Sequence, residues 1–163
     1  MKPDFKQLEK VVINVGLGRM SGLPNFTDKL LPAVLEELSL VTGQKAMTRP
    51  AKKSIAGFKL RQGTIVGLKV TLRGKKIKEF LNKLTMATLP RIRDFRGINN
   101  KAIDKNGNLS MGIKEQAVFP EITPETSKVT FGLEITVVPK LPIAKHEDAI
   151  KFYKELGIPF NKK

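Results

Sequence analysis

The sequence predicts an α+β fold: a mostly antiparallel β-sheet, helices packed on one face of it, and a long basic loop that protrudes from it. Two patterns predict this fold. Segments in which β-branched residues alternate with polar ones are typical of half-buried strands, and they are interleaved with longer segments whose apolar residues recur at helical spacing. The 163 residues show no internal repeat, low-complexity tract or linker, so we expect a single domain over residues 1–163.

The first predicted strand and helix precede residue 44. Glu9–Gly16 is β-branched and alternating, which predicts a strand. Asn25–Gly43 predicts an amphipathic helix, in which Pro32 lies near the first turns and Gly43 is a typical C-terminal stop. The residues expected to face the core are Val11, Ile13 and Val15 of the strand and Leu31, Val34, Leu35, Leu38 and Val41 of the helix.

Two further strands flank a long loop. Gln44–Thr48 predicts a short strand, and Thr64–Arg73 is the clearest strand of the chain. Between them, Arg49–Gly63 contains Pro and Gly and has little periodicity, so we expect a protruding loop or an irregular hairpin. On the second strand the residues expected on one face are Thr64, Val66, Leu68, Val70 and Leu72.

The second half of the chain predicts two helices and two strands. Pro90 follows the first of these helices, the Asn106–Gly107 pair is a strong turn signal, and Gly157 and Pro159 end the last helix. The apolar face of the first helix comprises Ile77, Phe80, Leu81 and Leu84. In order, the expected elements are a helix at Lys75–Leu89, strands at Met111–Phe119 and Phe131–Val138, and a helix at Glu147–Leu156.

The charge of the chain indicates an anionic partner. The net charge is +15, and Lys and Arg are concentrated between Leu38 and Arg93, where Glu79 is the only acidic residue. A membrane surface is the weaker candidate, because a membrane-binding helix would place Trp or Phe opposite its lysines. This chain has no Trp, and its basic residues lie mostly on predicted strands and loops. No apolar run approaches the ~20 residues of a membrane span, and the polar N-terminus predicts no signal peptide. We therefore expect nucleic acid and no membrane.

Catalytic and cofactor sites are not indicated, and we expect no metal and no cofactor. The absence of Cys excludes disulfides and thiolate metal sites. Gly16-x-Gly18 follows a strand, as in dinucleotide-binding proteins, but Ser21 stands where that fingerprint needs its third glycine. His146, the single histidine, has no recognisable nucleophile to activate. An RNA-processing enzyme is the alternative function, and it would need clustered carboxylates beside the basic segment. A turnover assay on labelled rRNA with Mg²⁺ distinguishes it.

One face of the predicted sheet has the composition of an RNA contact. The alternation of side chains places small, amide, hydroxyl and cationic groups on the side that faces away from the core. The segments that supply them contribute no carboxylate and no aromatic ring to this face, so we expect recognition of RNA shape and backbone more than base stacking. The residues are Lys10, Asn14, Gln44, Gly67, Lys69, Thr71 and Arg73.

Five sequence blocks, in order, resemble the large-subunit ribosomal protein five family. The blocks are VTGQKAMTRPAKKSIAGFKLRQG, GLKVTLRG, LPRIRDFRG, MGIKEQAVFPEI and LGIPF, and the resemblance extends from about Leu8 to Phe160. It implies a non-enzymatic constituent of the large ribosomal subunit, on a cytoplasmic or an organelle ribosome. In this family the protein binds 5S rRNA and helps attach it to the large-subunit rRNA in the central protuberance. It also contacts P-site tRNA and small-subunit ribosomal protein thirteen, bridging the subunits.

The resemblance assigns contacts to two basic segments. It assigns the sheet face with Asn14, Gln44 and Thr71 to rRNA, in agreement with the alternation of side chains. With their basic neighbours, the predicted rRNA-binding residues are Lys10, Asn14, Gln44, Lys45, Lys69, Thr71, Arg73, Arg91 and Arg93. It assigns the protruding Ala51–Gly63 loop to the elbow of the P-site tRNA. The predicted tRNA-contacting residues are Lys52, Lys53, Ser54, Phe58, Lys59 and Arg61.

Three acidic residues lie in or beside the loop PEITPETS, and RNA would repel them. Because the small-subunit partner in this family is basic, we predict that Glu115, Glu121 and Glu125 contribute to the intersubunit bridge. Solvated loop acids that balance a basic protein are the alternative. Two departures from the family pattern accompany the resemblance: the usual N-terminal helix before the first strand is absent, and His146 stands where the last helix usually has a Thr or Ser cap.

Overall fold

A computed structural model describes residues 5–161 except 124, 126 and 128. In this part of the chain, five strands form one antiparallel sheet in the order β2-β3-β1-β5-β4. The sheet and its helices confirm the predicted α+β class. The strands are β1 (Leu8–Gly16), β2 (Met47–Pro50), β3 (Ile65–Leu72), β4 (Leu109–Ile113) and β5 (Leu133–Pro139).

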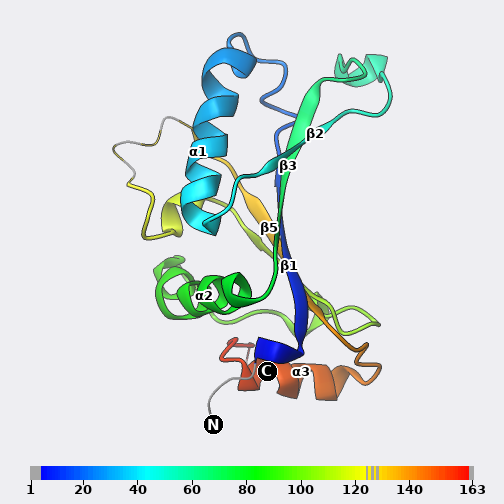
Figure 1. Cartoon of the computed structure of the whole chain (residues 1–163), viewed down its shortest axis with the longest axis vertical. Coiled ribbons are helices and arrows are strands. Elements are labelled where there is room, and N and C mark those ends of the chain that lie inside the picture. Colours follow the sequence, from blue (N-terminus) through cyan, green and yellow to red (C-terminus); the bar gives the residue numbers. More distant parts are fainter. Residues whose placement is uncertain (1–4, 124, 126, 128, 162–163) are drawn as a thin grey trace.

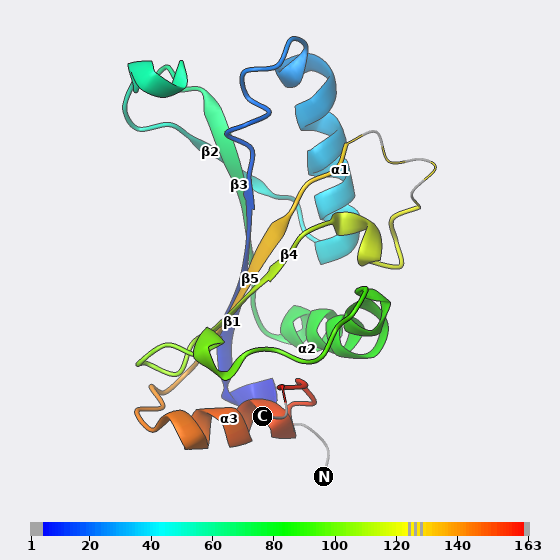
Figure 2. The ribbon, with the colours of Figure 1, turned by 180° about the vertical axis from the view of Figure 1, so that it is seen from behind.

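The helices leave one face of the sheet open. Helices α1 (Leu31–Thr42) and α2 (Lys75–Lys83) lie on the same side of the sheet in both views, whereas α3 (His146–Glu155) crosses its lower end (Figures 1 and 2). The connection between β2 and β3 projects from the upper end toward the open side (Figure 1). This arrangement gives the molecule a covered face, which holds the core, and an uncovered face.

Strand β1 is central and shows how the alternation of side chains separates the two faces. Val11, Ile13 and Val15 are buried under α1 and α2, as predicted, and Ile13 lies opposite Val70 of β3 and Ile135 of β5. Burying these apolar side chains removes them from water and is the main force that holds helices to sheet. Most core residues predicted on β3 and the two helices follow the same pattern: Leu68, Val70, Leu72, Leu31, Val34, Leu38, Val41, Ile77, Phe80, Leu81 and Leu84 are buried. Leu35 and Val66, predicted on the same faces, are only partly buried.

Two helix ends follow from local chemistry. Gly43 ends α1 in the left-handed conformation (φ 64°), which glycine adopts without the steric cost of a side chain. The predicted helix Lys75–Leu89 is regular only to Lys83 and continues as less regular helical turns to Arg91. In these turns the hydroxyl of Thr85 donates to the carbonyl of Leu81 (2.9 Å), and such bonds compete with the regular backbone pattern.

Two predicted strands differ most from their bounds in the structure, and the other three differ by one or two residues at an end. The first, expected at Gln44–Thr48, is β2, which begins at Met47. The hydroxyl of Thr42 holds the following residues to the end of α1, because it donates to the carbonyl of Leu38 within the helix (2.7 Å) and accepts from the amide of Gln44 (3.3 Å). The second, expected at Met111–Phe119, is β4, which ends at Ile113. The chain then turns at Gln116, whose buried side chain binds backbone groups instead.

Helix α3 is fastened to the sheet by a tyrosine. The hydroxyl of Tyr153, which is fully buried, donates to the carbonyl of Gly107 (2.7 Å) and also lies 3.2 Å from that of Val137. Burial raises the pKa of this hydroxyl. Gly107 has a left-handed backbone (φ 82°), consistent with the predicted turn. His146 is the first residue of α3, and Lys145 precedes it without a side-chain capping bond.

Candidate RNA-binding surface

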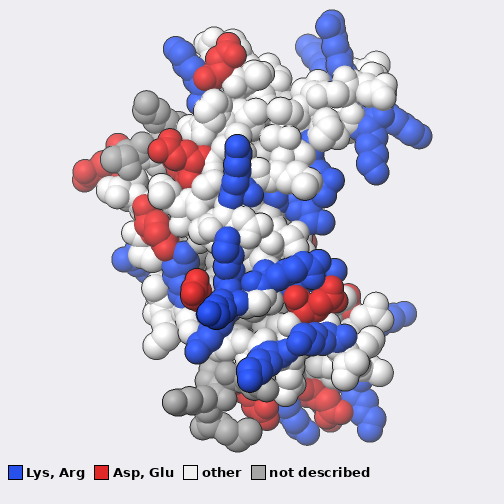
Figure 3. Space-filling model, viewed as in Figure 1, with Lys and Arg blue, Asp and Glu red and all other residues white. Residues whose placement is uncertain are grey.

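The uncovered face of the sheet is concave and mostly basic. Figure 3 shows a hollow on its right-hand side, between the β2–β3 projection above and the end of the sheet below, with Lys and Arg side chains along it. We call the outward-facing side chains of the five strands the sheet face. The polar and charged ones are Glu9, Lys10, Asn14, Arg49, Lys69, Thr71, Ser110, Glu134 and Thr136, where Glu9 lies at the irregularity near the start of β1.

A row of three polar side chains crosses the middle of the sheet face. Asn14 of β1 lies opposite Lys69 of β3 on one side and opposite Glu134 of β5 on the other. Thr71 lies on the same face, two residues along β3 from Lys69. The side chains of Asn14, Lys69, Glu134 and Thr71 make no hydrogen bond or ion pair with any described residue. Their hydrogen-bonding capacity is therefore available to a ligand.

The sheet face does carry acidic residues, contrary to the sequence-based expectation. Glu134 comes from β5, which the predicted face did not include. At the lower end, Glu9 lies 3.2 Å from Lys10 Nζ and 3.5 Å from Arg73 Nη1. The hydrogen bond and charge of Lys10, together with those of Arg73, hold the pKa of Glu9 below its usual value. Glu9 thus partly neutralises two of the predicted RNA-binding cations, Lys10 and Arg73. The bulge between Leu8 and Lys10 interrupts the alternation of β1 at this point.

Gln44 has a structural role beside the sheet face. Its Nε2 donates to the carbonyl of Thr71 (3.1 Å), and its Oε1 accepts from Lys76 Nζ (3.3 Å). These bonds tie the end of α1 to β3 and to the start of α2. Gln44 therefore contributes to the position of Thr71, while the neighbouring Lys45 is exposed.

The predicted tRNA-contacting residues gather on one projection, residues 51–63, which we call the finger. The backbone of Ala51 is bound to that of Thr64 and Gly63, and farther out Ile55 and Leu60 bond to each other in both directions. At the tip, Phe58 is 81% exposed. Lys and Arg side chains surround the tip at the upper right of Figure 3. The predicted tRNA-contacting residues, Lys52, Lys53, Ser54, Phe58, Lys59 and Arg61, are all exposed.

The remaining predicted sites lie elsewhere. Arg91 and Arg93 line an open cleft beside β4, the sheet edge farthest from the finger, together with Lys114 and Glu115. The structure does not bring these two arginines to the central row of the sheet face. The cleft also places Glu115 among cations, apart from the other predicted bridge acids.

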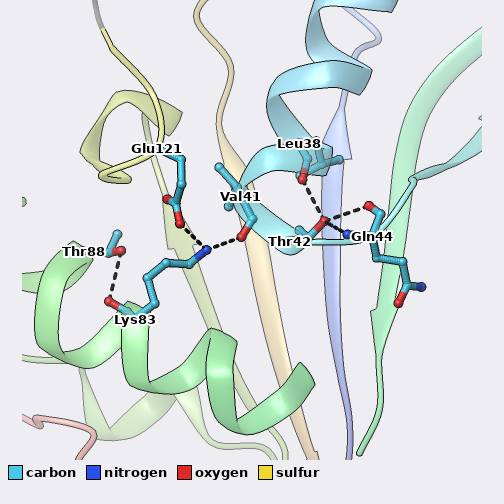
Figure 4. Close-up of polar contacts among 7 residues, drawn as sticks. All are labelled: Leu38, Val41, Thr42, Gln44, Lys83, Thr88 and Glu121. Carbon is cyan, nitrogen blue, oxygen red and sulfur yellow. Dashed lines mark hydrogen bonds and ion pairs between the residues drawn. The ribbon is translucent and has the colours of Figure 1, made fainter. Parts of the chain in front are cut away.

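Glu121 is held by the protein itself. Its Oε1 accepts a hydrogen bond from Lys83 Nζ at 2.6 Å, and the same nitrogen donates to the carbonyl of Val41 (2.5 Å), as Figure 4 shows. Lys83 thereby joins α2, the C-terminal end of α1 and the loop of Glu121. Glu125 is exposed and makes no ion pair with a described residue. The three predicted bridge acids therefore do not form one cluster.

Comparison with known proteins places the chain in a family. Residues 6–61 match a family model described as ribosomal protein L5, and residues 65–160 match one described as the C-terminus of the same ribosomal family. The chain belongs to the ribosomal protein L5 family. The two matched segments meet at the end of the finger, and both contribute strands to the single sheet. This confirms the resemblance found in the sequence blocks.

Several family members are similar over nearly the whole chain, and each is named large ribosomal subunit protein uL5. The protein of Oceanobacillus iheyensis is 48% identical over 98% of this chain and 86% of its own length. That of Halothermothrix orenii is 46% identical over 95% of this chain and 83% of its own. That of Geotalea uraniireducens is 47% identical over 96% of this chain and 84% of its own.

Two residues near these surfaces, Glu134 and Gln116, were not predicted from the sequence. Glu134 lies on the sheet face because β5 pairs with β1, where Glu134 is opposite Asn14. The two residues are 120 positions apart in the sequence, so no local pattern reveals this pairing. Gln116 is buried, and it binds Glu37, Ser127 and the backbone of Phe131. In the sequence it is one polar residue among several. A buried amide of this kind carries no periodic signal.

Proposed function

We propose that this chain is a non-enzymatic protein of the large ribosomal subunit that docks 5S rRNA through the sheet face. Membership of the ribosomal protein L5 family supports the ribosomal role. The observation that carries the proposed contact is the row Lys69, Asn14 and Glu134, with Thr71 beside it. These polar groups pair with no described residue, and they lie on a concave surface with more cations than carboxylates. The covered face of the sheet holds the core, so the sheet face is the one free to contact RNA.

The chemistry of the sheet face favours recognition of RNA shape. Its outward side chains include no aromatic ring on the described strands, so it lacks the platform on which single-stranded bases usually stack. Amide and hydroxyl groups such as those of Asn14 and Thr71 bind phosphates and 2′-hydroxyls at short range. Lys69 supplies the charge for a phosphate. A folded RNA helix or loop, with backbone on its surface, fits these groups.

The finger is proposed to contact P-site tRNA. It projects from the sheet end and presents cations without acidic neighbours in its sequence. Phe58 adds an exposed ring at the tip, and exposed aromatic rings stack on nucleobases. Lys53 and Lys59 would bind the backbone on either side. The finger has its own backbone bonds, so we expect it to keep its shape when that contact is lost.

The loop after β4 is proposed to face small-subunit ribosomal protein thirteen. Of the three acids predicted for this contact, Glu125 is exposed and free of ion pairs with described residues, whereas Glu121 is bound to Lys83. We therefore assign direct contact with the basic partner to Glu125, and to Glu121 the support of the loop. Glu115, which lies in the cleft with Arg91 and Arg93, is not included in this assignment. Exposed charges of this kind affect the rate and register of association more than affinity.

The experiment compares the two basic surfaces in one binding assay. Thr71→Ala or Asn14→Ala should weaken binding of isolated 5S rRNA by about 1–3 kcal/mol, because a polar contact in a desolvated interface is lost. The double variant Lys53→Ala with Lys59→Ala should leave that affinity nearly unchanged and weaken P-site tRNA retention on whole ribosomes. Equal loss of 5S rRNA binding in the finger and sheet-face variants would refute this division.

A further inference from the structure

Glu134 lies at the centre of the proposed 5S rRNA-binding face, where a carboxylate is unexpected. It stands opposite Asn14 on β1 and opposite Gly112 on β4, and its side chain is exposed. The nearest outward-facing cation along this row, Lys69, is one strand beyond Asn14. Glu134 pairs with no described cation, in contrast to Glu9 at the end of the same face. No described residue therefore neutralises the charge of Glu134 through an ion pair.

A free carboxylate opposes binding of RNA backbone, because it repels phosphates. It does favour the hydrogen-bond donors of RNA, which are the ribose 2′-hydroxyls and the N–H groups on the edges of unpaired bases. A 2′-hydroxyl offers a single donor, so it uses only one of the two carboxylate oxygens. Guanine is the base that presents two such donors side by side, at N1 and at the N2 amino group. Their spacing matches the two oxygens of a carboxylate, in the manner of other bidentate pairs.

The surroundings of Glu134 have room for a base. An open hollow on the sheet face is lined by Glu134, Asn14 and Arg49, with Gly16, Gly67 and Gly132 between them. An added Cβ at Gly16 would meet no atom within 4 Å, whereas at Gly67 and Gly132 it would meet backbone oxygens at 3.0 and 3.1 Å. The hollow thus has polar groups at its margin and little side-chain bulk on its floor.

We infer that Glu134 reads the Watson–Crick edge of an unpaired guanine in the bound RNA. Its two oxygens accept from guanine N1–H and N2–H, and the amide of Asn14, on the neighbouring strand, donates to guanine O6. Arg49, at the other margin of the hollow, is placed to bind the phosphate of the same strand of RNA. The inference rests on the proposed function, and it adds base specificity to a surface that otherwise recognises shape.

The test measures affinity for 5S rRNA and for an unrelated folded RNA of the same length, at one salt concentration. Glu134→Gln keeps the size of the side chain and removes one acceptor and the charge. We expect it to bind 5S rRNA about tenfold more weakly. It should bind the unrelated RNA as tightly as the wild type or more tightly, because a repulsive charge is gone. Glu134→Ala, which removes both acceptors, should lose at least as much. Glu36→Gln is the matched control: it makes the same charge change on α1, on the covered side of the sheet.

A second arm identifies the base. Unpaired guanosines of 5S rRNA are replaced one at a time by inosine, which lacks the N2 amino group. At one position the wild type should lose about tenfold, and Glu134→Ala should lose nothing further there. Equal tightening of both RNAs by Glu134→Gln would show that the carboxylate only repels RNA. An effect that disappears when Mg²⁺ is replaced by monovalent salt would show a bridging metal instead.

The outcomes separate the inference from the proposed function. If the wild type binds 5S rRNA no better than the unrelated RNA, the proposed function fails, and the inference fails with it. If the wild type is selective and the Glu134 variants are equally selective, only the inference is overturned. A selective wild type, a less selective Glu134→Gln and an unaffected Glu36→Gln support both.

Discussion

Replacing Gln116 with Leu should destabilise the protein through one buried hydrogen-bond network. Gln116 is 1% exposed, and its Oε1 accepts from the backbone amide of Phe131 (2.9 Å). Its Nε2 donates to Glu37 Oε2 (2.9 Å), to Ser127 Oγ (3.1 Å) and to the carbonyl of Val129. These contacts fasten the loop that follows β4 to helix α1, across 79 residues of sequence.

The magnitude follows from what each partner loses. Leu has a similar size, so the change leaves little cavity. The buried amide of Phe131, however, donates to no acceptor other than Gln116 among the described residues. Leaving a buried donor unpaired costs about 1–3 kcal/mol. The lost bond to the Glu37 carboxylate adds about 1.5–3 kcal/mol, since bonds to charged groups are stronger. The hydroxyl of Ser127 remains, and its one proton has two acceptors within reach, Glu37 Oε1 (2.8 Å) and the carbonyl of Val129 (3.0 Å). Burial of the Leu side chain offsets part of this, so we expect a net loss of about 3 kcal/mol in unfolding free energy.

Urea unfolding followed by circular dichroism measures this loss. With a denaturant slope of about 2 kcal/mol per molar, the midpoint should fall by about 1.5 M. Ser127→Ala should cost less, and its effect should shrink in the Gln116→Leu background, because the two residues share one network. Gln7→Leu, at an exposed Gln, is the control and should leave the midpoint unchanged. A midpoint shift for Gln116→Leu below about 0.3 M would refute the argument from burial.

Three further predictions concern single side chains. Burial raises the pKa of Asp104, but hydrogen bonds from Asn108 and nearby backbone amides outweigh it and hold the pKa low, so the stabilisation by Asp104 is present at neutral pH and is lost as pH falls through that lowered pKa. Asp104→Ala should lower the unfolding free energy by about 1 kcal/mol at pH 7. Calorimetry should find a smaller difference below about pH 4, and a constant difference would contradict the argument. Phe58→Ala should leave the melting temperature unchanged and weaken tRNA retention, measured by filter binding of programmed ribosomes; unaltered retention would remove the ring from the contact. Glu121→Gln should loosen the loop near Lys83, seen as faster amide hydrogen exchange there, and unchanged exchange would show that the ion pair does not hold the loop.

Local patterns in the sequence predicted the parts of the fold that local chemistry decides. The alternation of Val11, Ile13 and Val15 fixed which face of β1 enters the core, and Gly43 marked the end of α1. The predicted sheet face with Asn14 and Thr71 follows from the same alternation, because a strand can bury only one of its sides. The segment Arg49–Gly63, which includes the finger, was predicted to protrude because it contains Gly and Pro and has little periodicity.

Features that depend on pairing between distant segments were not predictable in this way. Glu134 joins the sheet face only through the register between β1 and β5. The ion pair of Lys83 and Glu121 links residues 38 positions apart, so Glu121 resembled a free surface acid in the sequence. Hydrogen bonds between side chains and backbone also accompany differences in element ends. The Thr42 hydroxyl accepts from the amide of Gln44, where β2 was predicted to begin, and β2 begins at Met47. Such contacts are set by tertiary structure and leave no periodic trace.

The salt dependence of 5S rRNA binding tests most directly whether the sheet face is the binding surface. Each phosphate that a cation neutralises contributes about −0.7 to −0.9 to the slope of log affinity against log salt concentration. The wild type should therefore show a slope of several units, and Lys69→Ala should reduce that slope by about one contact. Lys151→Ala, on α3 away from the sheet face, is the control and should leave the slope unchanged. A flat titration, or equal slopes for the wild type and Lys69→Ala, would contradict the proposed binding surface.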